Sequence, residues 1–307
     1  MKGDKNVAVR RRRCELSTPA ISMKMMQHAA ASAADEVFLD LEDSVAPSRK
    51  DEGRLNAIEA LNTLNWSGKV RAVRINNVYT PWCYRDVVDI MKGAGQNLDV
   101  IMIPKVLRAA DVLFVDILLS QLELELGFRK QIGLECLIET AEAMEYVREI
   151  ALSTPRLEAI IFGVGDYSAS LGIPVTSLSS IDKDMPYPGH RWNFALSRMA
   201  IAARTAGIQV IDGPFPGYKG EDLQTYQRHA EWSAALGYDG KWAIHPAQVP
   251  IAMKAYTPSD AVLAKAAKIA EAIEKGEKEG IGALTVDGDM VDAATYKIAM
   301  KILARKG

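Results

Sequence analysis

Ionisable residues end most of the short apolar runs in this chain. They are Glu42, Asp43, Arg74, Lys105, Glu139, Asp166, Asp212 and His245. Carboxylate oxygens are preferred ligands of divalent cations such as Mg²⁺, and arginine and lysine side chains bind anions or stabilise negative charge that develops during a reaction. If these side chains meet at one place, their types predict a site that holds a cation together with a small anionic substrate.

Glu139 and Asp166 are the two carboxylates that we expect to bind the metal ion. They end consecutive apolar runs, and Asp166 lies in the sequence GVGD, whose glycines let the backbone approach a ligand closely. Two oxygen ligands, with other positions open to water and substrate, predict Mg²⁺, or Mn²⁺ in its place, because the sequence has no His/Cys cluster suited to zinc. Asp166 could instead cap the helix that follows it.

Each basic residue of the set has two interpretations. Arg74 could bind a substrate carboxylate or stabilise an enolate oxygen, or it could form a structural salt bridge with Glu42 or Asp43. Lys105 could be a Schiff-base nucleophile, but among so many carboxylates we expect it to keep its proton and pair with them. His245 precedes a proline, and we expect it to brace its loop rather than act as a base.

These residues need a scaffold that brings the ends of several strands together. Apolar runs of strand length alternate with helical patterns, and the expected strands are 13–16, 36–41, 70–75, 100–103, 132–138, 159–162, 208–211 and 240–244. This alternation predicts an α/β fold, a (β/α)₈ TIM barrel over residues 1–250, whose active site lies at the C-terminal ends of the strands. All eight ionisable residues would then project toward one mouth.

Two further segments lie outside the regular alternation. Residues 174–189 are rich in Ser, Pro and Asp, and they predict a long surface loop or lid. Helices are expected at 259–274 and 290–304, on either side of the glycine-rich stretch 280–288, so that residues 251–307 form a C-terminal helical extension.

Composition limits the classes of partner. The 307 residues carry a formal net charge of −2 and no long apolar span, so we expect a soluble protein with no nucleic acid and no membrane as partner. The three cysteines, Cys14, Cys83 and Cys136, show no CxxC or metal-ligand spacing. They are expected to be reduced, buried thiols of a cytoplasmic protein.

An ordered set of motifs resembles the citrate lyase β-subunit-like (HpcH/HpaI aldolase) superfamily, and most of all its malyl-CoA lyase and β-methylmalyl-CoA lyase branch. The motifs are LDLEDSVAP at 39–47, VRIN at 73–76, DVIMIPKV at 99–106, LIET at 137–140, GVGDYSASLG at 163–172, IDGPF at 211–215 and GKWAIHPAQV at 240–249. The similarity covers the chain from about Cys14 to Ala304, and the set is far more specific than any single motif.

The resemblance implies a Mg²⁺-dependent carbon–carbon lyase. It would cleave or form a 3-hydroxyacyl-CoA acid of the malyl-CoA, β-methylmalyl-CoA or citramalyl-CoA type, from an acyl-CoA and a 2-oxo acid, glyoxylate or pyruvate. By the same resemblance Glu139 and Asp166 match the metal ligands, and Arg74 matches the arginine over the reacting carbonyl. The positions that support them or contact coenzyme A are Glu42, Asp43, Lys105, Ser17, Lys24 and Pro246.

Asp292, in GDMVDAA, resembles an acid/base carboxylate that members of this family insert into the active site of a neighbouring subunit. The resemblance therefore implies a homotrimer or hexamer. Three alternatives stay open: a malyl-CoA thioesterase, a CoA-independent class II 2-keto acid aldolase and a non-catalytic acyl-CoA-binding homologue. The aldolase stays open because the barrel and metal motifs are shared with that branch. The non-catalytic homologue is suggested by the turn at 18–23, which lacks the arginine of the family's GPGSRP-like turn.

Overall fold

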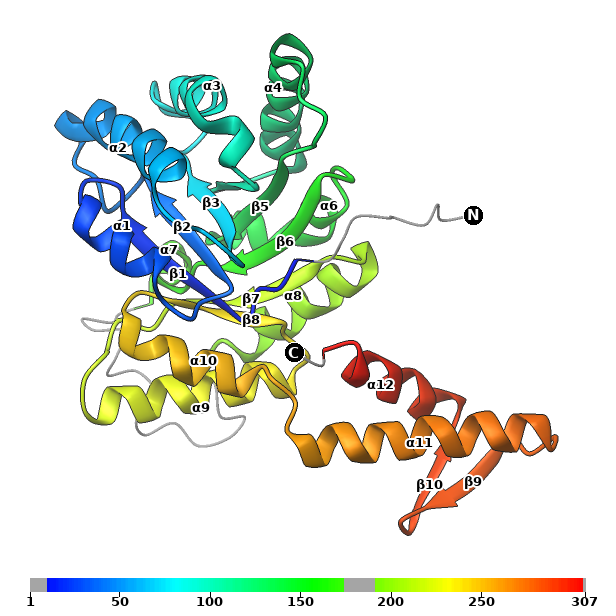
Figure 1. The fold of residues 1–307 in the computed structure, drawn as a ribbon. Coiled ribbons are helices and arrows are strands. Elements are labelled where there is room, and N and C mark those ends of the chain that lie inside the picture. The colour runs from blue at the N-terminus through cyan, green and yellow to red at the C-terminus, as the bar shows by residue number, and fades with distance from the viewer. Residues whose placement is uncertain (1–9, 174–190, 306–307) are drawn as a thin grey trace. The chain divides into compact units, whose positions relative to one another are not determined.

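A closed barrel of eight parallel strands is the main feature of the computed structural model, which describes residues 10–173 and 191–305 (Figure 1). Each strand pairs with the next along the chain, and the first pairs with the last. The strands are β1 (Cys14–Pro19), β2 (Glu36–Asp40), β3 (Val70–Arg74), β4 (Val100–Ile103), β5 (Gly133–Ile138), β6 (Leu157–Phe162), β7 (Gln209–Asp212) and β8 (Gly240–Ala243). Every predicted strand overlaps one of them, so the predicted (β/α)₈ barrel is confirmed.

Helices follow the strands and cover the outside of the barrel (Figure 1). They are α1 (Met23–Ala30), α2 (Lys50–Thr63), α3 (Cys83–Ala94), α4 (Ala109–Leu126), α5 (Ala141–Glu145), α6 (Val147–Ala151), α7 (Val164–Ser170), α8 (Asn193–Ala206), α9 (Glu221–Ala235) and α10 (Val249–Ala255), with 3₁₀ turns η1 (Pro47–Arg49), η2 (Gly95–Asn97) and η3 (Pro246–Gln248). The helical segment that follows β5 is divided at Tyr146 into α5 and α6. The loop or lid expected at 174–189 lies outside the described residues.

Apolar side chains fill the middle of the barrel. Successive side chains of a strand point to opposite faces, so alternate residues enter the interior and the others meet the helices. Phe38 and Trp242 pack edge to face in the interior, with ring centroids 5.1 Å apart. The apolar cluster comprises Phe38, Val70, Ala72, Val100, Met102, Leu137, Ala159, Ile161, Ile211 and Trp242. This layer separates the charged side chains at the two ends of the barrel.

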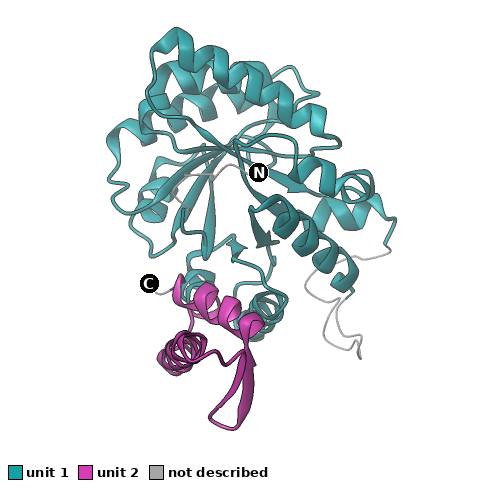
Figure 2. Ribbon diagram, turned by 90° about the vertical axis from the view of Figure 1, so that its right-hand side faces the viewer, with its two compact units in different colours: residues 1–253 teal, residues 254–307 magenta. Residues whose placement is uncertain are grey.

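Residues 254–307 form a second compact unit (Figure 2). It contains α11 (Asp260–Lys278), the antiparallel strands β9 (Ala283–Val286) and β10 (Asp289–Asp292), and α12 (Ala293–Leu303). Ile273, Val286 and Val291 make a small buried core of its own.

The expectation that this extension is purely helical is wrong. The stretch 280–288 is not only a glycine-rich separator, because β9 lies in it, and residues 290–292 are strand instead of helix. Asp287 and Gly288 join the two strands with φ angles of 51° and 88°. Positive φ at both central residues is typical of the two-residue hairpin turns that Asp-Gly sequences favour.

The three cysteines are in the state that their spacing in the sequence predicts. Cys14, Cys83 and Cys136 are free and buried, as expected, and burial raises the pKa of the Cys83 thiol to about 12.

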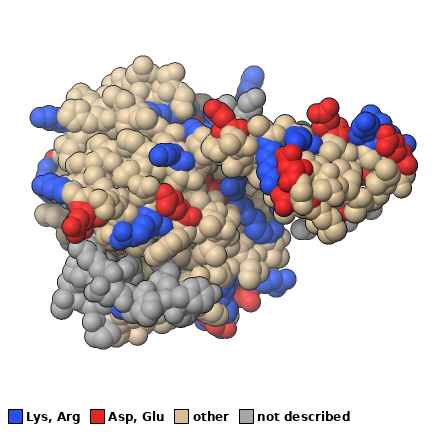
Figure 3. All heavy atoms as spheres, turned by 90° about the horizontal axis from the view of Figure 1, so that it is seen from below, with Lys and Arg blue, Asp and Glu red and all other residues tan. Residues whose placement is uncertain are grey.

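Over the described part of the chain, no helix combines the length and the apolar character that crossing a bilayer requires. Acidic and basic side chains are interspersed on the face drawn in Figure 3.

Candidate active site

Charged side chains gather where β2 to β6 end. Asp40 and Arg74 are the last residues of β2 and β3 and lie directly opposite each other in the sheet. Glu139 directly follows β5, and Glu42 and Lys105 lie one residue further beyond the ends of β2 and β4. Asp166 lies in the first turn of α7, just after β6. The C-terminal ends of the strands are where barrel enzymes place their active sites.

Arg74 is held by Asp40. Its Nε and Nη2 donate to the two oxygens of Asp40, both at 2.7 Å, and Nη1 lies 3.4 Å from Glu42 Oε2. The guanidinium carbon is 5.1 Å from the centroid of the Trp242 ring. Burial alone would lower the pKa of Arg74, but the charges of Asp40 and Glu42 outweigh it and raise that pKa, so the guanidinium stays charged and fixed.

The salt bridge considered for Arg74 from the sequence had the wrong main partner. The alternative considered for Arg74 named Glu42 or Asp43, and Glu42 does form an ion pair at 3.4 Å, but the two-pronged contact is made by Asp40. Asp40 was missed by the sequence analysis. The alternation of strand faces could have found it, because Phe38 points into the barrel and Asp40 is two residues further along the same strand.

Lys105 connects the carboxylates around it. Its backbone N–H donates to Glu139 Oε1 at 2.6 Å, and its Nζ donates to Glu42 Oε1 at 2.6 Å and to Asp43 Oδ1 at 3.0 Å. Nζ also lies 4.0 Å from Asp166 Oδ2. The expected pairing of Lys105 with carboxylates is therefore present. Burial would lower the pKa of Lys105, but the hydrogen bonds to Glu42 and Asp43 outweigh it and raise that pKa.

The backbone of Lys105 has a φ of 49°, which is unusual for a residue with a side chain. Such a conformation costs on the order of 1–3 kcal/mol and persists only where the surroundings enforce it. Here the strain turns the N–H toward Glu139 while the side chain reaches Glu42 on the other side. One residue thereby positions two of the candidate carboxylates.

Glu139 is buried among other negative charges. Only 3% of it is exposed, and burial together with the charges of Glu42 and Asp166 raises its pKa to about 8, against the stabilising contacts from Lys105 and Arg74. Gly163 makes room for it, because a Cβ at that position would lie 2.3 Å from the Glu139 Cβ. The carboxylate is thus confined in a place that favours a positive partner.

Asp166 does not cap the following helix. The N-cap of α7 is Gly163, with no side-chain capping bond, and Asp166 lies within the first turn. Its side chain is 46% exposed. The capping interpretation is therefore wrong, and the carboxylate remains available at the mouth.

This end of the barrel carries an excess of negative charge. It contains three cationic side chains, Arg74, Lys105 and Lys50, and five carboxylates, Asp40, Glu42, Asp43, Glu139 and Asp166. Lys50 Nζ donates to the backbone carbonyls of Leu41 and Glu42. Hard oxygen donors, a buried carboxylate of raised pKa and uncompensated negative charge all suit a divalent cation such as Mg²⁺. Glu139 and Asp166 are the residues that fit as its ligands.

Asp212 does not belong to this site, so its predicted place at the mouth is wrong. Its Oδ2 accepts hydrogen bonds from Ser233 Oγ of α9 at 2.8 Å and from Lys241 Nζ at 2.6 Å. The physical reason is the alternation along β7, in which Ile211 lies in the interior and the next residue faces the helices. Asp212 therefore ties β7 and β8 to α9.

The comparisons with known proteins agree with this geometry. The sequence profile of the family described as "HpcH/HpaI aldolase/citrate lyase" matches residues 13–246. The chain belongs to this family. The resemblance noted from the motifs is thereby confirmed.

Three proteins that resemble this chain in sequence or structure illustrate the activities found among its relatives. An L-malyl-CoA/beta-methylmalyl-CoA lyase of Cereibacter sphaeroides is 44% identical over 298 residues, which are 95% of this chain and 93% of the relative. A (3S)-malyl-CoA thioesterase of the same species is 33% identical, over 95% of this chain and 94% of its own. The solved structure of protein CitE from Mycobacterium tuberculosis, in complex with magnesium, acetoacetate and coenzyme A, is 28% identical, with a TM-score of 0.74 and coverage of 97% and 99%.

The three positions expected to contact coenzyme A lie along one side of the HpcH/HpaI barrel. Ser17 is in β1, where its hydroxyl donates to the carbonyl of Ala243 in the neighbouring β8 at 3.4 Å. Pro246 is exposed at the start of η3, and Lys24 is exposed on α1. The structure thus groups these positions by element, and none of them takes part in the charged cluster around Arg74.

His245 braces its loop, as predicted. Its Nδ1 accepts a hydrogen bond from the Ala247 N–H at 3.1 Å, which caps η3. Its ring also stacks on Tyr218, with centroids 4.4 Å apart. The contact with Tyr218 was not predicted from the sequence.

Asp292 belongs to the second unit and is the N-cap of α12. Its Oδ1 accepts from the backbone N–H groups of Ala294 at 2.9 Å and Thr295 at 3.1 Å. These hydrogen bonds lower the pKa of Asp292, so the half-buried side chain is ionised at neutral pH. An ionised carboxylate can accept a proton, which is what an acid/base residue of the HpcH/HpaI family would have to do first in synthesis.

Proposed function

We propose that this chain is a Mg²⁺-dependent carbon–carbon lyase that acts on malyl-CoA or β-methylmalyl-CoA. The observation that carries the proposal is the arrangement of a buried, fixed Arg74 beside Glu139 and Asp166 at the mouth of the barrel. It is supported by 44% identity, over nearly the whole of both chains, to a relative with that activity in its name. Magnesium and coenzyme A are bound by a structural neighbour.

The proposed reaction is a reversible Claisen-type cleavage. The bond between the hydroxyl-bearing carbon and the carbon next to the thioester breaks, and its electron pair passes to the thioester as an enolate. The hydroxyl loses its proton and becomes the carbonyl of glyoxylate, while the enolate gains a proton and becomes acetyl-CoA or propionyl-CoA. The site must therefore stabilise one developing oxyanion and move protons at two positions.

Glu139 and Asp166 would hold the cation, which supplies electrostatic stabilisation to the hydroxyl and carboxylate oxygens of the substrate when it is bound. Arg74 stabilises the enolate oxygen. Two of its nitrogens are engaged by Asp40, whereas Nη1 lies 3.4 Å from Glu42 Oε2, and we assign the contact with the enolate oxygen to this third nitrogen. A preorganised charged donor costs little reorganisation during the reaction.

Asp292 is proposed as the group that gives the enolate its proton and takes it back in synthesis. Its unit has a hydrophobic core of its own, Ile273, Val286 and Val291, and can therefore be presented as a separate body to another subunit. We propose a homo-oligomer, a trimer or a hexamer, in which the Asp292 of one subunit completes the barrel site of the next. Ser17, Lys24 and Pro246 are proposed to contact coenzyme A.

A substrate panel tests the function. The purified chain is incubated with Mg²⁺ and malyl-CoA, β-methylmalyl-CoA, citramalyl-CoA, or the corresponding free acids, and the products are separated by chromatography. We expect cleavage of the first two thioesters to glyoxylate and acetyl-CoA or propionyl-CoA. Turnover of the free acids alone would mean a CoA-independent aldolase, and binding without turnover of any compound would mean a non-catalytic homologue.

The second candidate is a malyl-CoA thioesterase, because one relative of that name is 33% identical over 95% of this chain. In that reaction water attacks the thioester carbonyl, and malate and free CoA are released. The lower identity makes it the weaker candidate. The appearance of malate instead of glyoxylate in the same experiment would favour it.

A further inference from the structure

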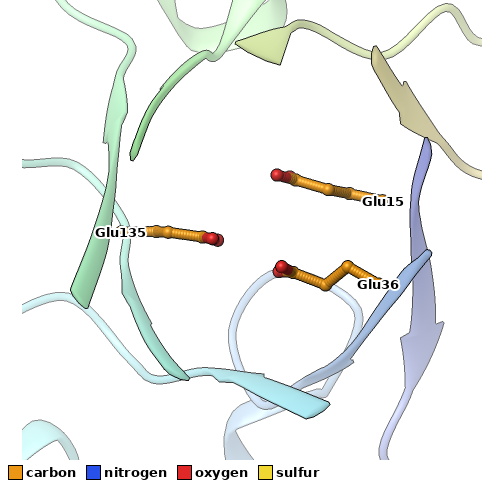
Figure 4. Close-up of side chains that lie close together, drawn as sticks. All are labelled: Glu15, Glu36 and Glu135. Carbon is orange, nitrogen blue, oxygen red and sulfur yellow. The ribbon is translucent and has the colours of Figure 1, made fainter. Parts of the chain in front are cut away.

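Three glutamates point at one another inside the barrel, at the end where the strands begin (Figure 4). Glu15 lies in β1, Glu36 opens β2 and Glu135 lies in β5. All three are 0% exposed, and one oxygen from each lies within 4.8 Å of the others. Glu135 lies in β5, and the candidate metal ligand Glu139 directly follows that strand, about 13 Å further along the extended chain, so this cluster is at the opposite end from the candidate active site.

Arg12 is the cation that contacts the cluster. Its Nε donates to Glu36 Oε2 at 3.0 Å and to Glu135 Oε1. Its other nitrogens turn away, since Nη1 donates to Gln209 and Nη2 donates to Glu158, both at 2.6 Å. The guanidinium therefore satisfies one oxygen of Glu36 and one of Glu135, and none of Glu15.

Four buried oxygens of the cluster have no hydrogen-bond donor within the described residues. They are both oxygens of Glu15, Oε1 of Glu36 and Oε2 of Glu135. A buried carboxylate without a partner costs far more than a buried hydrogen-bonded one, so these oxygens require a positive species between them. Burial and the neighbouring glutamates raise the pKa values of Glu15 and Glu36 well above the usual range, which reflects the same excess of negative charge.

We propose that Glu15, Glu36 and Glu135 bind a structural divalent cation of the size of Ca²⁺. The donors are hard oxygens, and three carboxylates with one guanidinium leave two negative charges, which one divalent ion neutralises. The three oxygens lie within 4.8 Å of one another, close enough for one ion to bind all of them. Ca²⁺ suits such a buried cluster better than Mg²⁺, because Ca²⁺ accepts irregular oxygen coordination whereas Mg²⁺ demands a near-ideal octahedron and usually keeps several waters. The ion joins β1 and β2 to β5.

Two protons shared among the glutamates would give the same net charge as one divalent ion, and the experiment must separate these cases. The candidate active-site ligands are first neutralised by Glu139→Gln with Asp166→Asn, so that ions bound there do not contribute. This protein is unfolded with chelator, refolded with Ca²⁺, Mn²⁺, Mg²⁺ or EDTA, and desalted. Metal content by mass spectrometry and Tm are then measured; no activity is needed.

We expect about one Ca²⁺ per chain after refolding with Ca²⁺, and a higher Tm than after refolding with EDTA. Adding Glu15→Gln should abolish both the retained ion and the Ca²⁺-dependent rise in Tm. Glu158→Gln is the matched control. Glu158 also contacts Arg12 but is not one of the three convergent carboxylates, so this variant should keep the ion.

Either of two results would overturn the proposal. If none of the three cations is retained and Tm is the same after refolding with EDTA, the cluster is held by protons. If Glu15→Gln retains as much Ca²⁺ as its parent, the ion lies elsewhere. Should Glu15→Gln fail to fold, the metal content and the Ca²⁺ dependence of Tm in the parent protein decide on their own.

Discussion

Asp40 and Arg74 face each other across β2 and β3 and are joined by two parallel hydrogen bonds of 2.7 Å. The pair is nearly inaccessible to solvent, with side-chain exposures of 3% and 6%. Arg74 is thus fixed in orientation before any substrate arrives, and Asp40 acts on the reaction only through it. That makes Asp40 a positioning residue whose removal should damage catalysis while the chemical groups of the site remain.

Asp40→Asn is predicted to lower kcat/KM by about 10²-fold, because losing one anchor lets the guanidinium move by a distance that such enzymes do not tolerate. A matched control exists in the same strand, where Arg71 makes the same two-pronged contact with Asp99 at the half-exposed start of β3. Asp99→Asn should leave kcat/KM unchanged. Both variants are checked for folding by circular dichroism, and kcat/KM is measured by steady-state kinetics. Equal kcat/KM values for the two variants would contradict the role of Asp40.

Gly163→Ala is predicted to displace Glu139, because the added methyl group would lie 2.3 Å from the Glu139 Cβ. The affinity for Mg²⁺ should fall at least about tenfold, as expected for loss of one well-placed oxygen ligand. Gly53→Ala in α2 is the control, since the added Cβ would lie 3.4 Å from a side-chain carbon of Val45, an ordinary contact distance. Titration of Mg²⁺ by calorimetry decides; equal affinities in the two variants would remove Glu139 from the ligand set.

Removal of the metal should make stability depend on the ionisation of Glu139. The pKa of its carboxyl in the folded chain is about 8, above the usual 4.5. A raised pKa means that protonation stabilises the fold fully below about pH 4.5 and that this contribution is lost as the pH rises through about 8. In EDTA, Tm should therefore fall from pH 5 to 8, and Mg²⁺ should restore it most at the alkaline end.

Glu139→Gln is the control for that measurement, because an amide does not titrate. Its Tm in EDTA should decline less over the same interval, and Mg²⁺ should change it little. Identical pH profiles for the two proteins would mean that Glu139 is not the titrating group.

Alternating apolar runs and helical patterns were enough to predict the barrel and to place Glu42, Arg74, Lys105 and Glu139 at one end of it. Asp212 was misplaced because its position at a strand end predicts a place at the mouth only if its side chain lies on the inner face, and it lies on the outer one. Applying the two-residue period would have sent Asp212 outward and brought Asp40 inward. The strand period was therefore a signal that the sequence carried and that was left unused.

Other features needed three-dimensional contacts. The β9–β10 hairpin had a local signal in Asp287-Gly288, but the helical spacing around it was the stronger pattern. Glu15, Glu36 and Glu135 come from three strands far apart in sequence, and only the closed barrel brings their carboxylates together. The positive φ of Lys105 likewise has no sequence signature, because it is imposed by Glu139 and Glu42.

Asp292→Ala is predicted to lower kcat by on the order of 10² to 10⁴, the usual contribution of general acid–base catalysis, while Mg²⁺ affinity stays nearly unchanged. Mixed oligomers of Asp292→Ala with Glu139→Gln should regain part of the activity, since some sites then contain both intact residues. Mixing Glu139→Gln with Asp166→Asn is the control and should give no rescue, because both changes lie in the same barrel site. Absence of rescue after proven subunit exchange would exclude a site shared between subunits.

The product balance from malyl-CoA tests the proposed activity most directly. Glyoxylate, acetyl-CoA, malate and free CoA are quantified over time with the wild-type chain and Mg²⁺, and again with excess EDTA. We expect glyoxylate and acetyl-CoA in equal amounts, no accumulation of malate, and no turnover in EDTA. Malate and free CoA in equal amounts, or cleavage that continues undiminished in EDTA, would contradict the proposed activity.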